Sequence, residues 1–249
     1  MYFHNIASGS KGNATVVVSK ETVILIDMGI SFVSLEEGLK EVNLTSANID
    51  VALFTHDHRD HYNGLRFLKT KKCFALEGTL PSLCGIVELY KPFKVKNVTI
   101  TPLKTSHDAT NPCGYMLEDG EEKLVYMTDT GMFLEENLEY CKNPDYLIIE
   151  SNHDISMELK TNRPQLLKER VLGDHGHLCN EDSAYASLEI MGPRTKEIYL
   201  AHLSEEANTP ETALKAYRDI FLDHNVDLDK LKIICLQQYA STTGGRYED

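Results

Sequence analysis

Five short apolar segments of this 249-residue chain are each followed, within a few positions, by a histidine or a carboxylate. Their apolar and β-branched composition is typical of buried strands. Because strands of layered sheets commonly end at the same edge, we expect the polar residues to converge there. The five pairs are Val51–Phe54 with His56, Ile100–Leu103 with His107, Leu124–Met127 with Asp129, Tyr146–Ile149 with Glu150, and Ile198–Ala201 with His202.

The densest group of such side chains follows the first segment. It contains three imidazoles and two carboxylates, in the order His56, Asp57, His58, Asp60, His61. Imidazole together with carboxylate suits zinc, manganese or iron. In a loop that leaves a strand, His56 and His58 can point to one side while Asp60 and His61 point to another, which would seat two metals. A polar loop that merely happens to be rich in histidine is the alternative. We favour metal, because so dense a cluster is costly without a cation.

Nothing in the composition indicates a membrane or secreted protein. No segment approaches the ~20 consecutive apolar residues of a membrane span, and the chain starts with neither a basic nor an apolar leader segment. The six cysteines form no C-x-x-C pair, a pattern typical of reduced, mostly buried thiols in a cytosolic protein. We therefore expect a cytoplasmic protein with no membrane partner.

The chain has no linker, low-complexity tract or strong repeat, so residues 1–249 are expected to form a single α/β domain. Expected strands are 14–19, 22–27, 51–54, 95–103, 114–117, 124–127, 146–149, 198–201 and 232–236. Expected helices are 32–42, 65–69, 163–172, 181–191 and 210–222. Thr209 and Asn180 are the expected N-caps of the last two helices.

The segment His56-x-His58-x-Asp60-His61 is similar to the H-x-H-x-D-H signature of the metallo-β-lactamase superfamily. The resemblance continues in a later histidine, an aspartate at a strand end and a final histidine, and in an early aspartate that supports the ligand loop without binding metal. These residues are His107, Asp129, His202 and Asp27. The resemblance covers the chain nearly end to end. It implies an αββα four-layer sandwich with a binuclear metal site at one edge.

Four further segments resemble the bacterial YycJ (WalJ) group, which is related to tRNase Z and the β-CASP nucleases. They are Ser8–Asn13, Glu150–Asp154, Gly176–Asn180 and Ala201–Ser204. The group is associated with 5′-to-3′ exonuclease activity on DNA. This chain departs from it at Asp57, where glutamate is usual, and at Cys179, where serine is usual. The stretch from Asp129 to His202 is also too short for a β-CASP insertion.

With this resemblance, we expect His56, His58 and His107 to hold one divalent metal and Asp60, His61 and His202 to hold the other. Asp129 would bridge them. Zinc or manganese is expected, and iron is compatible with the donors. The expected nucleophile is a metal-bridging hydroxide, which Asp60 could orient. By correspondence with tRNase Z, His177, held protonated by Glu150, would give a proton to the leaving alkoxide. The alternative for His177 is a residue that caps the turn after it.

Further residues are candidates for substrate binding. Ser10, Gly12 and Asn13 lie in a small-residue loop that could approach the site through backbone N–H groups, or form an ordinary tight turn. His153 could line the substrate cleft, whereas His175 has no slot beside the assigned ligands.

The expected substrate is a nucleic acid, with DNA favoured over RNA. The net charge of −13 opposes this expectation, because nucleic-acid binders usually carry a basic surface. A small-molecule metallohydrolase that acts on a lactone, thioester or other ester fits the charge better, but leaves Glu150 and His177 without a role. A redox member of the superfamily would be expected to carry an additional domain. A non-catalytic member would be expected to have lost some of the metal ligands. The oligomeric state stays open.

Overall fold

The computed structural model describes residues 1–68, 71–80 and 84–247. It divides into two compact units. The first comprises Met1–Leu103, Ala109–Glu122 and Leu236–Asp249, and the second comprises Lys104–Asp108 and Lys123–Cys235. The single-domain organisation expected for residues 1–249 stays a prediction.

The first unit contains a seven-stranded sheet with the order β14-β1-β2-β3-β4-β5-β6. Strands β14, β1, β2 and β3 pair antiparallel, and β3 to β6 pair parallel. The strands are β1 (Tyr2–Ala7), β2 (Ala14–Ser19), β3 (Thr22–Ile26), β4 (Val51–Leu53), β5 (Lys72–Leu76), β6 (Gly85–Val87) and β14 (Thr242–Gly245). Every residue of β2 and β3 is buried, as their unbroken β-branched runs require.

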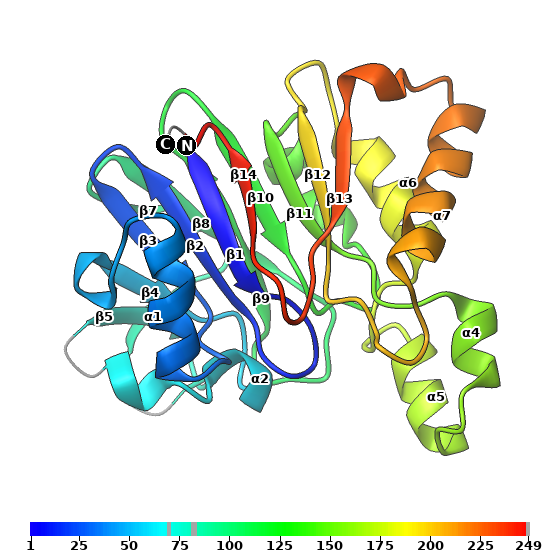
Figure 1. Ribbon diagram of the computed structural model, residues 1–249, viewed down its shortest axis with the longest axis horizontal. Helices are drawn as coiled ribbons and strands as arrows, with labels where there is room; N and C mark the ends of the chain where they lie inside the picture. The colour runs from blue at the N-terminus through cyan, green and yellow to red at the C-terminus, as the bar shows by residue number, and fades with distance from the viewer. Residues whose placement is uncertain (69–70, 81–83, 248–249) are drawn as a thin grey trace. The chain divides into compact units, whose positions relative to one another are not determined.

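Helix α1 (Phe32–Glu41) lies across this sheet (Figure 1). It begins at Ser31, whose side-chain oxygen accepts a hydrogen bond from the Ser34 N–H at 3.0 Å. Leu35 and Leu39, one helical turn apart, are fully buried in the core that the sheet and helix share. Full burial of a leucine side chain stabilises a fold by about 1.5–3 kcal/mol. This pair therefore fixes α1 to the sheet.

Three further strands begin in the first unit. They are β7 (Phe93–Val95), β8 (Val98–Lys104) and β9 (Cys113–Glu118). The single strand expected over 95–103 is divided into β7 and β8, because the chain turns at Lys96, which has a left-handed φ of 49°. The two strands then pair antiparallel, with Phe93 opposite Ile100.

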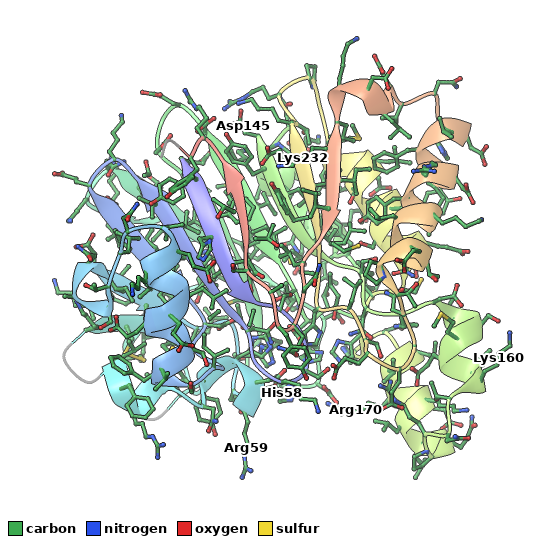
Figure 2. All side chains as sticks on the ribbon, in the orientation of Figure 1. His58, Arg59, Asp145, Lys160, Arg170 and Lys232 are labelled. Atoms are coloured by element: carbon green, nitrogen blue, oxygen red, sulfur yellow. A yellow bond between two sulfur atoms is a disulfide. The ribbon has the colours of Figure 1, made fainter. Side chains whose placement is uncertain are left out.

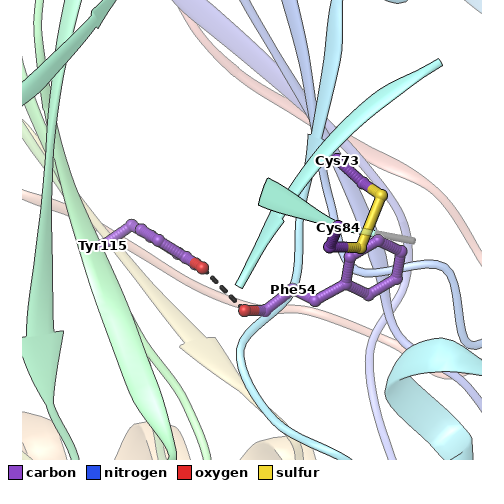
Figure 3. The surroundings of a disulfide bond; sticks show 4 residues. All are labelled: Phe54, Cys73, Cys84 and Tyr115. Atoms are coloured by element: carbon purple, nitrogen blue, oxygen red, sulfur yellow. Dashed lines mark hydrogen bonds between the residues drawn. A yellow bond between two sulfur atoms is a disulfide. The ribbon is translucent and has the colours of Figure 1, made fainter. Parts of the chain in front are cut away.

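Cys73 and Cys84 form a disulfide (Figure 3), so the expectation of reduced thiols is wrong for this pair. Cys73 lies on β5 and Cys84 directly precedes the neighbouring β6. Because Phe74 lies opposite Gly85, the two cysteines are adjacent across the parallel pair, with Cα atoms 4.7 Å apart. The other four cysteines are free and buried, as expected. Figure 3 also shows the nearby Tyr115 hydroxyl donating to the Phe54 carbonyl, at 2.6 Å.

The second unit is built on four parallel strands in the order β13-β12-β11-β10. These are β10 (Lys123–Met127), β11 (Tyr146–Glu150), β12 (Glu197–Ala201) and β13 (Lys232–Cys235). Helix α6 (Asn180–Ile190) packs against β11, and α7 (Pro210–Asp223) packs against β13 and α6 (Figure 1). The short helices α3 (Leu138–Cys141), α4 (Ile155–Lys160) and α5 (Gln165–Leu172) complete the unit.

The register of these parallel strands aligns their carboxyl ends. Met127 lies opposite Ile149, and Glu150 lies opposite Ala201. The next residues along the chain therefore leave the sheet at one edge. This confirms, within the second unit, the expected convergence of polar residues at strand ends.

The expected helices are present with altered boundaries. Pro164 has an extended backbone, with a ψ of 146°, and its ring disfavours a helical conformation at the residue before it, so α5 begins at Gln165 and not at 163. The N-cap of α6 is Cys179, whose Sγ accepts from the Asp182 N–H at 3.4 Å, so the expected Asn180 cap is wrong by one residue. Thr209 caps α7 as expected. The helix expected over 65–69 is a 3₁₀ turn, Leu65–Leu68, and its last residue lies outside the described part.

Candidate metal and acid–base site

The first unit places its candidate ligands in the loop after β4 and on helix α2 (Arg59–Tyr62). Asp27, directly after the neighbouring β3, organises this loop. Its fully buried carboxylate accepts hydrogen bonds from the Thr55 N–H at 2.9 Å and from the Thr55 hydroxyl. Burial raises the pKa of Asp27, although the contacts with His61 and Thr55 oppose this shift. Asp27 therefore supports the ligand loop, as expected for the early aspartate.

Asp27 also fixes the ring of His61. His61 Nδ1 lies 2.8 Å from Asp27 Oδ2, and His61 Nε2 lies 3.0 Å from the side-chain amide nitrogen of Asn13. An amide N–H donates to an unprotonated ring nitrogen, so these contacts favour the tautomer with its proton on Nδ1. The Nε2 lone pair is the one that a metal ion would use.

His56 and Asp60 lie beside His61, and His58 lies beside His56. The His56 ring centroid lies 4.1 Å from that of His61 and 4.6 Å from that of His58. Asp60 Oδ2 lies 3.5 Å from His61 Nε2. The neighbouring Arg59 points away from the chain (Figure 2). The carboxylate of Asp57 accepts a hydrogen bond from the Thr110 N–H at 3.0 Å. Four of the five polar side chains thus gather, and Asp57 holds a neighbouring loop.

The small-residue loop after β1 braces this cluster. The Asn13 N–H donates to the Asp60 carbonyl at 2.8 Å, and the Gly12 N–H donates to the Gly9 carbonyl at 3.1 Å. Gly12 has a φ of 153°, and a Cβ there would lie 2.8 Å from the Gly29 carbonyl oxygen. Ser10 is exposed on the same loop. The N–H groups of Gly12 and Asn13 are used within the loop and its anchor, and the substrate roles of Ser10, Gly12 and Asn13 stay predictions.

The second unit places Glu150 at the centre of its own cluster. This fully buried carboxylate accepts from the Thr130 N–H at 2.8 Å. Its Oε1 lies 2.7 Å from His177 Nδ1 and 3.0 Å from His202 Nδ1. Burial by itself would raise the pKa of Glu150. The contacts with His177 and His202 outweigh burial and hold that pKa well below its usual range. Glu150 is therefore ionised at neutral pH, and its Oε1 is an acceptor for an N–H of either ring.

Asp129 and His202 follow β10 and β12 in the left-handed region, with φ values of 57° and 56°. Such a backbone is costly for non-glycine residues and is concentrated at functional sites. Asp129 Oδ1 lies 3.5 Å from His202 Nδ1 and 3.9 Å from His177 Nδ1. With Glu150, these residues offer ligand atoms that all lie within 4.8 Å of one another. The group is therefore compact enough to surround a cation.

His107 joins the same cluster. Its Nδ1 lies 2.9 Å from the Gly176 carbonyl oxygen, which fixes the ring, and its Nε2 lies 3.8 Å from Asp129 Oδ1. Burial lowers the pKa of His107, with Asp129 opposing this shift, so the ring is neutral at neutral pH. Because the neutral His107 ring is anchored at Nδ1, its Nε2 is the atom available to a metal ion, as it is in His61 of the first unit. The donor sets of both units therefore fit divalent metal ions by chemistry and anchoring.

The two remaining histidines of these loops have different surroundings. His175 Nδ1 lies 2.9 Å from the Ser106 hydroxyl, so His175 braces the residue before His107. His153 is buried and lines a pocket beside α4. Sequence reasoning missed Thr55 and Thr130, whose hydrogen bonds orient the carboxylates, and Asn152, whose amide donates to the His202 carbonyl at 2.7 Å. Only Asn152 carried a signal, because it lies within the segment Glu150–Asp154.

Comparison with known proteins decides the family. The profile of the beta-lactamase superfamily domain matches residues 22–202, nearly three quarters of the chain and all the candidate ligands. The chain belongs to the metallo-β-lactamase superfamily. This confirms the predicted fold class, the αββα sandwich typical of the superfamily, and the predicted enzyme class, a hydrolase. Membership of the superfamily also implies divalent metal ions.

Two curated members of the superfamily resemble this chain over most of its length. The exodeoxyribonuclease YycJ of Bacillus anthracis is 34% identical over 227 residues, which cover 86% of each chain. The exodeoxyribonuclease WalJ of Streptococcus pneumoniae is 34% identical over 224 residues, covering 84% of this chain and 83% of its own. These matches confirm the resemblance to the YycJ (WalJ) group.

A solved structure of the superfamily agrees with the fold. The metallo-β-lactamase fold protein YhfI of Bacillus subtilis is 16% identical, with a TM-score of 0.70, over 98% of this chain and 100% of its own. No helix in the described part of the chain combines the length and the apolar character needed to span a membrane.

Proposed function

We propose that this superfamily member is a metal-dependent phosphodiesterase, most specifically a 5′-to-3′ exonuclease that acts on DNA. The observation that carries the proposal is the hydrogen-bonded pair of Glu150 and His177 beside Asp129 and His202. Breaking a phosphodiester releases an alkoxide that needs a proton, and a histidine held by an ionised carboxylate can supply one. The 34% identity to two curated exodeoxyribonucleases supports DNA as the substrate.

The metal donors of both units are proposed to act together. His56, His58 and His107 would hold one ion, Asp60, His61 and His202 the other, and Asp129 would bridge them. Zinc and manganese are the proposed metals, and iron is compatible with the same donors. When bound, two such ions would supply a water-derived nucleophile at neutral pH and offset the charge on the substrate phosphate.

The remaining chemistry belongs to side chains of this chain. Glu150, ionised and fully buried, lies 2.7 Å from His177 Nδ1 and orients this ring, whose side chain is 17% exposed and can reach a substrate. His177 gives its proton to the leaving oxygen, an effect that typically contributes about 10²–10⁴-fold to a rate. Asp60, braced by Asn13, orients the attacking water.

The net charge of −13 argues against a broad basic surface on this protein that would contact many DNA phosphates. Binding is instead proposed to be weak, dominated by the metal site and strongly dependent on salt. The cytoplasmic location expected from the sequence is part of the same proposal.

The test is a cleavage time course on 5′-phosphorylated, end-labelled DNA and RNA with added manganese or zinc. The wild type is compared with His58→Ala and His177→Ala, and with His224→Ala as the matched control, because His224 is exposed at the end of α7. We expect shortening of DNA from the 5′ end, absent in His58→Ala, slowed about 10²-fold or more in His177→Ala and unchanged in His224→Ala.

A small-molecule metallohydrolase acting on a lactone, thioester or other ester is the second candidate. The acidic charge of the chain is the observation that favours it. Intact DNA and RNA under every metal, in protein shown to hold two metal ions and to hydrolyse such an ester, would establish this candidate and overturn the nuclease.

A further inference from the structure

The second unit contains a pocket of about 480 Å³ between helix α4 and the start of α6. Its volume lies within the ~300–1,000 Å³ range of small-molecule sites. His153 and Cys179 lie at its inner end, and Ile155, Leu159, Lys160 and Glu181 are among its other lining residues. Neither the metal donors nor the acid–base pair are part of this lining.

His153 is the feature of this pocket that indicates a ligand. The residue is only 1% exposed, yet its Nδ1 has no hydrogen-bond partner among the described residues. A buried polar atom without a partner is costly and rare in native proteins. Burial lowers the pKa of His153 to about 4, so the ring is neutral at neutral pH and can either donate or accept at Nδ1. This atom has almost no accessible surface, so a bound ligand would satisfy it once the ring turns toward the pocket.

The wall formed by α4 is apolar. Ile155 and Leu159 are four residues apart, on one face of the helix, and are 45% and 55% exposed. Two large aliphatic side chains left this exposed, side by side on a pocket wall, present a surface on which a flat ring can pack.

The side-chain charges around the pocket disfavour an anionic occupant. Asp154 and Glu181 contribute two carboxylates, whereas Lys160 contributes one ammonium group. With His153 neutral, the lining is negative overall and would repel a phosphate from the interior. Lys160, exposed in the last turn of α4, points outward from the helix (Figure 2). The pocket therefore suits an uncharged heteroaromatic ring, with any phosphate left outside.

The inner end of the pocket is joined to the acid–base pair by the chain itself. His153 and Cys179 form a parallel β-bridge, and the Asn180 N–H donates to the His153 carbonyl at 2.9 Å. Glu150 precedes His153 by three residues, and His177 precedes Cys179 by two. A ring bound in the pocket would therefore lie close to the residues that act on the phosphate.

We propose that this pocket binds the nucleobase of one nucleotide of the substrate. His153 Nδ1 forms a hydrogen bond with the edge of the base, and Ile155 and Leu159 pack against its face. The inference rests on the proposed nuclease function and adds to it the part of the substrate, other than the phosphate, that the enzyme recognises.

The test measures binding of deoxyadenosine 5′-monophosphate and of deoxyribose 5-phosphate to the metal-loaded protein by titration calorimetry. Leu159→Ala removes part of the pocket wall, and Leu166→Ala is the matched control, because Leu166 is 80% exposed on the neighbouring α5. Both positions are exposed, so both variants are expected to fold. His153→Ala tests the hydrogen bond, with folding checked by circular dichroism.

We expect the wild type to bind the nucleotide about tenfold more tightly than the sugar phosphate, because the base buries apolar surface. Leu159→Ala should weaken nucleotide binding about fivefold and leave sugar-phosphate binding unchanged, and Leu166→Ala should match the wild type. Equal affinities for the two ligands, or equal effects of the two leucine substitutions, would overturn the base pocket.

Cleavage of DNA by the same variants separates this inference from the proposed function. If Leu159→Ala raises the KM for DNA and Leu166→Ala does not, the pocket serves the nuclease. If no variant cleaves DNA but the wild type still prefers the nucleotide to the sugar phosphate, the nuclease proposal fails and the base pocket stands. If DNA is cleaved and the nucleotide preference is absent, the base pocket fails alone.

Discussion

His202 Nδ1 lies 3.0 Å from Glu150 Oε1, the same carboxylate oxygen that lies 2.7 Å from His177 Nδ1. A candidate metal donor and the candidate general acid therefore share one buried acceptor. Two imidazoles that share an ionised carboxylate affect each other's protonation. The acid–base pair and the metal site are thus expected to respond together when Glu150 is changed.

Glu150→Gln is predicted to lower the rate of cleavage by about 10²–10⁴-fold, because a neutral amide no longer gives His177 an ionised hydrogen-bond partner. Steady-state kinetics on end-labelled DNA would measure the loss. Adding His177→Ala to this variant should lower the rate little further, because the two residues act as a unit. A double variant slower by the product of the two single effects would show that they act independently. Glu169→Gln, on the exposed part of α5, is the control.

Asp27→Asn is predicted to weaken metal binding about 10–100-fold while the fold is retained. The carboxylate fixes His61 Nδ1 at 2.8 Å, and loss of such an outer partner typically costs this much affinity. Competition with a chromophoric chelator gives the affinity, and Asp227→Asn, an exposed aspartate, is the control. Equal metal affinity in Asp27→Asn and the wild type would show that His61 needs no anchor.

Gly29→Ala is predicted to disrupt the ligand loop. A Cβ at this position would lie 1.6 Å from the Asp60 carbonyl oxygen, a backbone atom that cannot move without displacing Asp60 and the start of α2. We expect metal affinity to fall and the free energy of unfolding to decrease by about 1–3 kcal/mol, the usual cost of forcing atoms into a packed site. Urea denaturation and metal titration measure the two effects. Unchanged metal affinity would mean that the loop tolerates the shift.

Asp145 provides a prediction on pH that does not involve the metal site. Burial raises its pKa, but hydrogen bonds from the Lys123 N–H and from Lys196 and Arg194 outweigh this and lower the pKa overall. A folded-state pKa below the unfolded value means that the carboxylate stabilises the fold above the unfolded pKa of about 3.9. This stability is lost as the pH falls through the lower, folded-state value.

Asp145→Asn should therefore decrease the free energy of unfolding by about 1–3 kcal/mol at pH 7, from the loss of charge-assisted hydrogen bonds. The difference from the wild type should shrink as the pH falls below about 4. Urea denaturation of both proteins over this range measures the difference. A difference that stays constant down to the lowest pH at which both proteins fold would contradict the assignment to ionised Asp145.

The sequence predicted the parts of this molecule that depend on local pattern. Apolar runs located most of the strands, and the residues that follow them include the candidate ligands. Three contacts could not be predicted, because they depend on which distant segments become neighbours. They are the Cys73–Cys84 disulfide, the contact of Asn13 with His61, and the sharing of Glu150 by two histidines. Each requires knowledge of strand order and register, which no local pattern encodes.

The β-bridge between His153 and Cys179 has a consequence for how this enzyme could diversify. The same two short loops carry the residues of the proposed base pocket and the pair that transfers the proton. A substitution that moves one loop to admit a different base would also move Glu150 or His177. Substrate preference and turnover would therefore change together during evolution, and altered specificity should be reached most readily through exposed positions of α4.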